Sequence, residues 1–387
     1  MLSSQEQIFI SDMLKDDLEQ ARARNQERLN RSLTLVQSLI AQWNMLFARC
    51  FNDRRHPALE PETVEHANRE YSRRFPSSLA EKIEEVMIRP DDYIQNVTDY
   101  ERSIGGRPTV TFPTDDEWYR LIVSDPLRIE EELLLQEAVL DHGLPEHPPL
   151  RVLDLGTGNG RMARSVCSLL SGSGVPGTVQ ICGLDSGMAN LVDGQRMSRE
   201  HGACSVHFLC GDMALLPLVT GSCHIICAAS CLNLVPEYVQ PLVILEMLRC
   251  LDDDGEGLIT GPNEHFSAEN YVRCTVATNL ARYALPWDMI EAHNLGQIGM
   301  VIDDLVRNRR DCAYLPSSEF HEIVSIMGCR LISRSQWPQK GTEPAIFSGL
   351  RFRATPETKR RLERSRRQCS RMDLHLGTGP LREPAPM

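Results

Sequence analysis

Three glycines at alternate positions give the sequence its clearest chemical signal. Gly156, Gly158 and Gly160 follow the short apolar run Val152–Leu155, which is typical of a buried parallel strand. Glycines at such a bend let the backbone turn sharply and let a ligand approach where a side chain would collide with it. A dinucleotide-binding fingerprint would place its third glycine at the next position, where this chain has Arg161. The spacing therefore favours a ligand-binding loop of another type.

Two acidic residues follow further apolar runs downstream. Asp185 ends the run Val179–Leu184, and Asp212 lies two residues beyond the run Val206–Cys210. Ligands of open parallel sheets bind at the carboxyl ends of the strands, so we expect both carboxylates at the edge where the glycine loop lies. A carboxylate only accepts hydrogen bonds and can bind both hydroxyls of one sugar. A fourth apolar run, His224–Ala229, follows and predicts a fourth strand.

The pattern Asp-x-Gly-x-Gly-x-Gly from Asp154 to Gly160 resembles the first motif of class I S-adenosylmethionine (SAM)-dependent methyltransferases. The three later segments follow in the order that this family shows. One departure occurs before the fourth strand, where the family usually has Phe-Asp and this chain has Cys223-His224. The resemblance covers roughly residues 126–355. It implies an α/β fold with a doubly wound, mostly parallel seven-stranded sheet.

The resemblance also implies SAM as the cofactor and gives the motif residues their roles. Asp154 would order the glycine loop, Asp185 would bind the ribose, and Asp212 would accept a hydrogen bond from the adenine amino group. Taken alone, Asp185-Ser186-Gly187 is better interpreted as a turn or a helix cap than as a ribose-binding segment. The cofactor-binding residues expected on this basis are Asp154, Gly156, Gly158, Gly160, Asp185, Ser186, Asp212, Met213 and Ala229.

Composition limits the classes of partner. The formal net charge of −12 over 387 residues argues against nucleic acid, because phosphate binding needs a basic surface. The exception is residues 356–372, with seven basic side chains, which we interpret as a solvated helix or tail; the alternative is a nuclear-import or nucleic-acid patch. We expect no membrane span, no secretory signal, a cytoplasmic location and reduced thiols for the 13 cysteines. No Cys-x-x-Cys spacing occurs, so we expect no metal site.

The chain is expected to have three parts. Residues 1–120 form a helical N-terminal region, residues 121–355 the methyltransferase core with a helical insertion at 263–313 over the active site, and residues 356–387 a basic, disordered tail. An apolar seam from Leu29 to Phe47 lies in a long helix at 4–51. It could pair with a second chain to form a homodimer, or pack on the protein's own core.

Further elements follow from the apolar periodicity and from the breaker residues. In the N-terminal region we predict helices at 60–75 and 78–88, and then a looser segment that includes Gly105-Gly106-Arg107-Pro108. In the core we predict helices at 126–142, 162–170, 241–251 and 317–327, a turn at 252–255, and strands at 257–260, 329–333 and 346–353.

His265 is the candidate catalytic base. It follows the fifth predicted strand, on the edge where a methyl acceptor should lie, and a histidine there could deprotonate a hydroxyl near neutral pH. The alternative is a surface or loop-anchoring histidine. Asn233 and Glu264 are weaker candidates for orienting substrate. Tyr271, Tyr283 and Trp287 could form an aromatic wall, although packing within helices is the better interpretation.

The acceptor class is narrowed by missing motifs. No Asn/Asp-Pro-Pro-Tyr follows the fourth strand, where enzymes that methylate base or glutamine nitrogens usually carry one. A small-molecule acceptor therefore ranks first, with oxygen, nitrogen and carbon nucleophiles all open. The alternatives are a catalytically silent partner subunit with the same fold, or a methyltransferase acting on RNA or protein through the basic tail. Arg161 and Asp212 disfavour a nicotinamide-dependent oxidoreductase.

Overall fold

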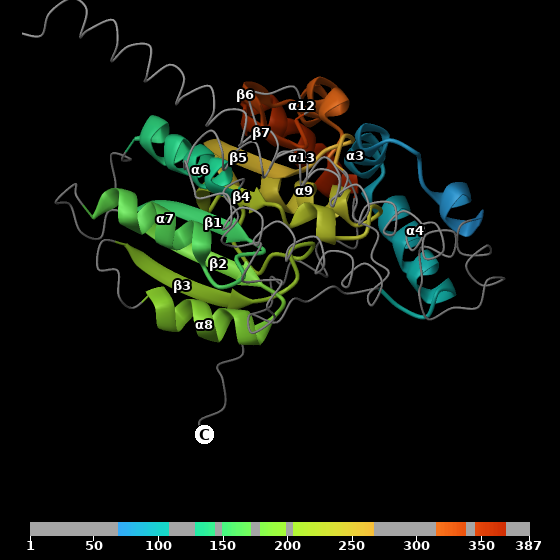
Figure 1. Cartoon of the computed structure of the whole chain (residues 1–387). Helices are drawn as coiled ribbons and strands as arrows, with labels where there is room; N and C mark the ends of the chain where they lie inside the picture. Colours follow the sequence, from blue (N-terminus) through green and yellow to red (C-terminus); the bar gives the residue numbers. More distant parts are fainter. Residues whose placement is uncertain are drawn as a thin grey trace, which may run out of the picture. The chain divides into compact units, whose positions relative to one another are not determined.

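Seven strands form one sheet in the order β3-β2-β1-β4-β5-β7-β6 (Figure 1). The computed structural model describes residues 69–107, 128–143, 149–171, 179–198, 204–266, 315–337 and 345–368, and all of these belong to one compact unit. The strands are β1 (Leu150–Leu155), β2 (Val179–Asp185), β3 (Ser205–Cys210), β4 (Cys223–Ala229), β5 (Leu251–Pro262), β6 (Arg330–Trp337) and β7 (Phe347–Arg353). The sheet is mixed, because β7 pairs antiparallel with both β5 and β6 while the other strands pair in parallel.

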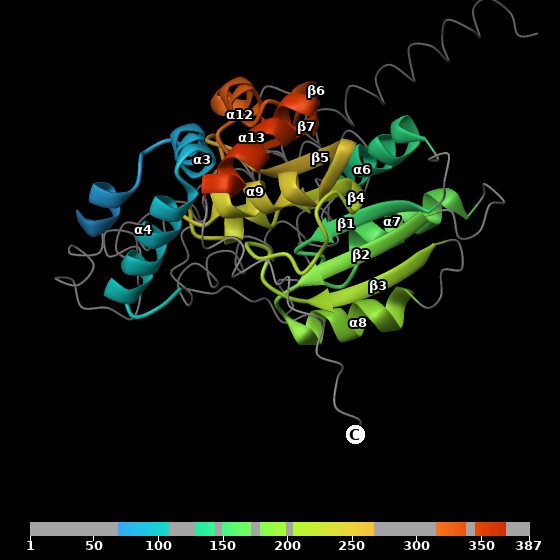
Figure 2. The ribbon, with the colours of Figure 1, turned by 180° about the vertical axis from the view of Figure 1, so that it is seen from behind.

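Helices cover both faces of this sheet. They are α3 (Leu79–Ile88), α4 (Pro90–Ser103), α6 (Ile129–His142), α7 (Arg161–Leu170), α8 (Met188–Ser198), α9 (Gln240–Cys250), α12 (Phe320–Met327) and α13 (Pro356–Gln368). From β1, the connections through α7 and α8 lead toward the β3 edge of the sheet, whereas from β4 the connection through α9 leads toward the β6 edge. Because such connections are right-handed, helices on the two routes lie on opposite faces of the sheet. α6 contacts α7 on one side, and α3 contacts α9, α12 and α13 on the other (Figures 1 and 2). The order reverses between β1 and β4, which is where open sheets bind ligands.

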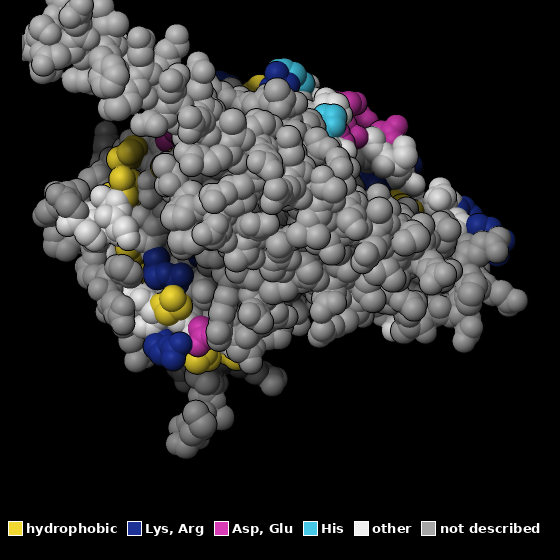
Figure 3. Space-filling view, viewed as in Figure 1, with side chains coloured by type: hydrophobic (Ala, Val, Ile, Leu, Met, Phe, Trp, Pro, Cys, Tyr) yellow, Lys and Arg dark blue, Asp and Glu magenta, His cyan; other side chains and the backbone are white. Residues whose placement is uncertain are grey.

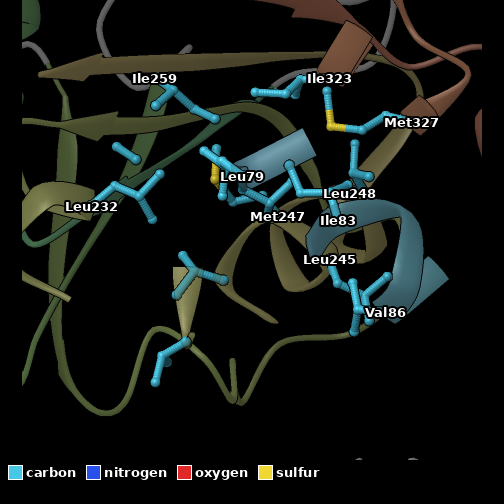
Figure 4. Close-up of a cluster of buried hydrophobic side chains, with 14 of the residues drawn as sticks. Leu79, Ile83, Val86, Leu232, Leu245, Met247, Leu248, Ile259, Ile323 and Met327 are labelled. Carbon is cyan, nitrogen blue, oxygen red and sulfur yellow. The ribbon is translucent and has the colours of Figure 1, made fainter. Parts of the chain in front are cut away.

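The N-terminal helix α3 is part of the main apolar core. Ser78 caps it, since its hydroxyl accepts from the N–H of Glu81 and the Glu81 side chain accepts from the N–H of Ser78. Apolar residues at helical spacing then face the core (Figure 4). The labelled side chains are Leu79, Ile83 and Val86 of α3, Leu245, Met247 and Leu248 of α9, Ile323 and Met327 of α12, Leu232 and Ile259. Helix α3 is therefore fixed to the same core as the sheet.

Two predicted elements differ from the structure. The segment after residue 88, predicted without a helix, contains α4, because Pro90 occupies the first turn, where its missing N–H costs nothing, and Asp91 and Asp92 favour the helix start. The predicted turn at 252–255 lies within β5, where the pairing advances from Cys223–Leu251 to Ile225–Glu256 through an irregularity. In the basic segment at 356–372, predicted as a helix or tail, residues 356–368 form the helix α13.

The other predicted helices and strands in the described ranges occur close to their expected positions. Helix 317–327 begins with a 3-10 turn, Ser317–Glu319, before α12. The long helix at 4–51 with its seam, most of the insertion at 263–313, the three aromatic residues within it and residues 369–387 lie outside the described residues. In the part of the chain that the structure describes, no helix has the length and apolar character needed to cross a membrane.

Basic and acidic side chains lie close together on the surfaces of helices α8 and α13. Over α8, Figure 3 shows basic and acidic side chains next to one another, and on this helix Arg196 forms an ion pair with Asp193 at 3.3 Å. In α13, Arg360, Arg361 and Arg364 all pair with Glu357. Several basic side chains are thus engaged within the protein.

Candidate active site

The predicted ligand-binding residues gather at one edge of the sheet. The last residue of β1, Leu155, pairs with Leu184, and Asp185 at the end of β2 pairs with Cys210 at the end of β3. Two backbone hydrogen bonds join the loops that follow: Thr157 N–H to Leu184 O at 3.0 Å, and Gly211 N–H to Asp185 O at 3.1 Å. The glycine loop and the loops that carry Asp185 and Asp212 are therefore held together at the carboxyl ends of the strands.

Asp185 faces the glycine loop. Its Oδ2 accepts a hydrogen bond from the Gly158 N–H at 2.9 Å, and its Oδ1 accepts one from the Gly187 N–H at 2.7 Å. Gly158 has φ +55°, a conformation that glycine adopts at little cost and that turns its N–H toward the carboxylate. A carboxylate has about four acceptor positions, so each oxygen keeps a lone pair for a further donor. This arrangement suits the two hydroxyls of a ribose.

Asp154 is a buried acid beneath the loop. Its side chain is 1% exposed and accepts a hydrogen bond from the Thr157 hydroxyl at 2.6 Å, which ties the start of the loop to β1. Burial raises the pKa of Asp154 to about 7, although the Thr157 hydrogen bond and the nearby charge of Arg161 act in the opposite direction. The contact agrees with the predicted role of Asp154 in ordering the loop.

The structure shows why positions 156 and 160 need glycine, and the reason differs from the predicted approach of a ligand. A Cβ on Gly156 would lie 2.3 Å from Cβ of Cys231, and one on Gly160 would lie 2.8 Å from the ring of Phe208. The protein itself therefore fills the space that a side chain would take at these two positions. Both also have positive φ values, +62° and +77°, which favour glycine at this turn.

Asp212 lies at the outer end of the same edge. Its side chain is 53% exposed, and it accepts hydrogen bonds from the Ala214 N–H at 2.9 Å and from the guanidinium of Arg107 at 2.8 Å. The neighbouring Met213 reaches inward, with its methyl carbon 3.7 Å from the Cβ position built on Gly156. Ser186, also predicted at the site, offers its carbonyl to the thiol of Cys210 at 3.7 Å. The structure thus brings the Met213 side chain to the glycine loop and leaves the Asp212 carboxylate open to solvent.

A buried network that the sequence did not reveal lies at the ends of β4 and β5. Glu131 of α6 is fully buried and accepts hydrogen bonds from the hydroxyls of Ser230 and Thr260. Its other oxygen pairs with Arg161 at 2.9 Å, so the residue at the position of the missing third glycine has a structural partner. Desolvation by burial opposes ionisation, but the charges of Arg128 and Arg161 together with the two hydroxyl hydrogen bonds outweigh it and lower the pKa of Glu131. The charged form is therefore the one that the site holds.

Ser230 has an unusual backbone. It directly follows Ala229, the last residue of β4 and one of the predicted site residues, and among the described residues it is the one non-glycine with a positive φ, +48°. Its hydroxyl is bonded to Glu131 and its N–H to the carbonyl of Thr260 at 2.9 Å. Such strained positions are maintained only where the surroundings enforce them. Glu131 and Thr260 thus fix the chain direction after β4, where a methyl acceptor is expected.

The candidate base lies just beyond β5. His265 is exposed, and its backbone N–H donates to Oδ1 of Asn263 at 2.9 Å. Asn263 is fully buried, and its Nδ2 donates to the carbonyl of Ala345 and the hydroxyl of Ser348. This buried anchor fixes the backbone that carries His265. Glu264 accepts from the backbone N–H and the hydroxyl of Ser317, which makes it a loop anchor.

Asn233 has the clearest unused hydrogen-bonding capacity near β5. Its Oδ1 is buried and accepts no hydrogen bond from the residues that the structure describes. The same oxygen lies 3.8 Å from the Cβ position built on Gly261, near the end of β5. A buried acceptor without a donor is costly, so this oxygen is suited to a donor on a ligand. Within the described ranges, no group of three or more His, Cys, Asp or Glu side chains is arranged to hold a metal ion.

Comparisons with known proteins agree with the motifs. Residues 152–255 match the family described as a methyltransferase domain. A SAM-dependent methyltransferase from Aquifex aeolicus is 15% identical, with 62% of this chain and all of that chain covered and a TM-score of 0.39. A 1,6-didemethyltoxoflavin-N1-methyltransferase from Burkholderia thailandensis, solved with S-adenosylhomocysteine, is 11% identical and has a TM-score of 0.40. The alignment covers 65% of this chain and 94% of that chain.

No curated protein matches the sequence. The family match agrees with the glycine loop, the two acidic residues and the observed strand order. The match identifies residues 152–255 as a methyltransferase domain, and its motifs and strand order resemble those of class I SAM-dependent enzymes.

Proposed function

We propose that the protein transfers a methyl group from SAM to a small-molecule acceptor by in-line displacement. When bound, SAM supplies a methyl group on a positively charged sulfonium, so the leaving group needs no further activation. The tasks of the protein are then to align donor and acceptor, to exclude water and, for acceptors that carry a proton, to remove it. The nucleophile can be oxygen, nitrogen or carbon.

The observation that carries this proposal is the hydrogen bond between Gly158 N–H and Asp185. It directs an acidic side chain with spare acceptor positions toward the glycine loop, at the point where the strand order reverses. In the proposed site Asp185 binds the ribose, Asp212 accepts from the adenine amino group, and Met213 packs beside the ring. Gly158 supplies the close backbone approach, while Asp154 keeps the loop in shape.

The acceptor would bind beyond the ends of β4 and β5. The buried Oδ1 of Asn233 offers it a hydrogen-bond acceptor, and the His265 imidazole is our candidate for removing its proton. Two contacts of α13 also favour a small molecule over a polyanion. Arg361 donates to the carbonyl of Ser325, where α12 ends, and Lys359 donates to the carbonyl of Leu251. These two basic groups are already engaged inside the protein.

Methyl transfer into fractionated extract tests the acceptor class. SAM with a radiolabelled methyl group is incubated with the purified protein and either an ultrafiltrate of cell extract or the retained macromolecules. We expect label in a small organic product, made by wild type and not by the Asp185→Ala variant. Label confined to RNA or protein would overturn the small-molecule assignment, and SAM binding without label in either fraction would indicate a catalytically silent subunit.

A further inference from the structure

An arginine from the N-terminal helical region reaches the proposed adenine site. Arg107 follows α4 after Gly105 and Gly106, whose φ values of +84° and +125° turn the chain out of the helix. Its Nη1 donates to Oδ2 of Asp212 at 2.8 Å, and its Nε donates to Oε1 of Glu101 on α4. One guanidinium therefore joins the end of α4 to the loop after β3.

Helix α4, which precedes Arg107, is anchored by buried aromatic side chains. Tyr93 of α4 donates its hydroxyl to the carbonyl of Tyr238 at 3.0 Å, and the ring of Tyr100 packs on Tyr238 with centroids 5.0 Å apart. These three side chains are all at most 3% exposed, so α4 rests on a buried aromatic cluster. Such a scaffold presents Arg107 from a fixed direction, which a free surface arginine would lack.

The surroundings of the guanidinium are partly dry. The Arg107 side chain is 29% exposed, and that of Glu101 is 19% exposed, so their ion pair is shielded more than a typical surface pair. The buried hydroxyl of Tyr238, which has no hydrogen-bond partner in the described parts of the chain, interacts electrostatically with both groups. An arginine presents several N–H groups in a rigid fork, which lets it bind Glu101 and Asp212 together.

We propose that Arg107 is a positioning residue for the cofactor: it orients the Asp212 carboxylate so that a free lone pair meets the 6-amino group of adenine. The idea rests on the proposed role of Asp212 and extends it. Asp212 is the more exposed partner, and its Oδ1 is already fixed by the Ala214 N–H. Arg107 fixes the other oxygen, and a carboxylate held at both oxygens presents its remaining lone pairs in fixed directions.

An oriented Asp212 should also affect which base the site accepts. A carboxylate accepts from an amino group but is repelled by an oxo group, so an oriented Asp212 should distinguish adenine from hypoxanthine. Arg107 would sharpen this difference without touching the ribose or the methionine part. A purely structural role of Arg107, such as tethering α4, would change the affinity for both bases equally.

The test measures binding of S-adenosylhomocysteine and S-inosylhomocysteine by calorimetry. Wild type should prefer the adenine compound, and Arg107→Ala should weaken its binding about five- to tenfold while changing the inosine compound much less. Arg107→Lys, which keeps the charge but cannot bind both carboxylates in the same way, should lie between them. The matched control is Arg102→Ala, because Arg102 lies on the same helix and pairs only at the surface, with Asp99.

The outcomes distinguish a positioning role of Arg107 from a purely structural role. Equal weakening toward both compounds, unchanged binding or tighter binding in Arg107→Ala would each overturn the inference; tighter binding would mean that Arg107 competes with adenine. If Arg107→Ala does not fold, the same comparison in Arg107→Lys and Glu101→Gln decides. Failure of wild type to bind either compound would instead refute the proposed cofactor site. In an Asp212→Ala background, the Arg107→Ala effect should disappear.

Discussion

The hydroxyl of Ser230 donates a hydrogen bond to the carboxylate of Glu131, which no solvent reaches. The pair joins the end of β4 to the first turn of α6, 99 residues apart in sequence. It holds Ser230 at a positive φ just where the chain leaves the sheet toward Asn233. A buried charge thus fixes the backbone beyond β4, where we propose that the acceptor binds.

Loss of Glu131 should therefore be costly. Glu131→Ala removes the partner of Arg161, whose side chain is 15% exposed, and leaves a largely buried guanidinium with less compensation. We expect a loss of about 3–5 kcal/mol in the free energy of unfolding, measured by urea denaturation. The control is Glu132→Ala, which removes the second and more exposed partner of Arg161 and should cost about 1 kcal/mol. Equal losses in the two variants would contradict the role given to Glu131.

Because the pKa of Asp154 is raised in the folded protein, the free energy of unfolding should depend on pH. Burial raises the pKa of Asp154 in the folded state to about 7 from its ordinary value of 3.8, so folding favours the protonated form. Its contribution is full below about pH 4 and is lost as the pH rises through 7. Asp154→Asn keeps an acceptor for Thr157 but carries no charge. The variant should gain stability relative to wild type between pH 4 and 8, on the order of 4 kcal/mol in total.

This gain is measured from urea denaturation of both proteins at several pH values. A difference between the two proteins that does not vary with pH would show that Asp154 is not held as a buried acid.

Gly160 and Phe208 should be energetically coupled. The Cβ of Gly160→Ala would meet the Phe208 ring at 2.8 Å at a positive φ, so we expect a loss of about 2–4 kcal/mol in unfolding free energy. In a Phe208→Leu background the steric part should fall, leaving about 1 kcal/mol from the backbone. A double-mutant cycle measures this difference. Additive effects would mean that the ring does not occupy the space beside Gly160.

His265 should act on the pH dependence of turnover once an acceptor is known. For an acceptor that must lose a proton, His265→Ala should lower kcat by about 10²–10⁴-fold and remove the acidic limb of the pH profile of kcat/KM. His207→Ala is the matched control, because His207 is exposed on β3 and contacts Ser205. A His265→Ala profile with the wild-type shape would exclude His265 as the base.

Much of the fold could be predicted because most of the parallel strands are short apolar runs. Residues 179–185 and 223–229 are recognisable in this way, and the buried strand β4 has almost no exposed side chain. Helix α4 could not be found, because its polar sequence and Pro90 resemble a loop until its packing through Tyr93 and Tyr100 is known.

The site was predictable only in part, for a similar reason. Asp185 ends one predicted strand and Asp212 closely follows another, and this local pattern is enough to find them. Glu131 and Arg107 act on residues about 100 positions away, and nothing in their local sequence indicates these partners. The packing of Cys231 against Gly156 could not be predicted either. In a sequence, a glycine required by protein packing cannot be distinguished from a glycine required by a ligand.

Calorimetric titration of the protein with SAM tests the central claim most directly. Wild type should bind SAM, Asp185→Ala should bind about 10–100-fold more weakly, and Gly158→Val should not bind measurably, because valine does not tolerate φ +55°. The matched control, Asp193→Ala, removes a surface acid of α8 that pairs with Arg196 and should bind like wild type. No binding by wild type, or equal binding by wild type, Asp185→Ala and Gly158→Val, would contradict a SAM site at the ends of β1 and β2.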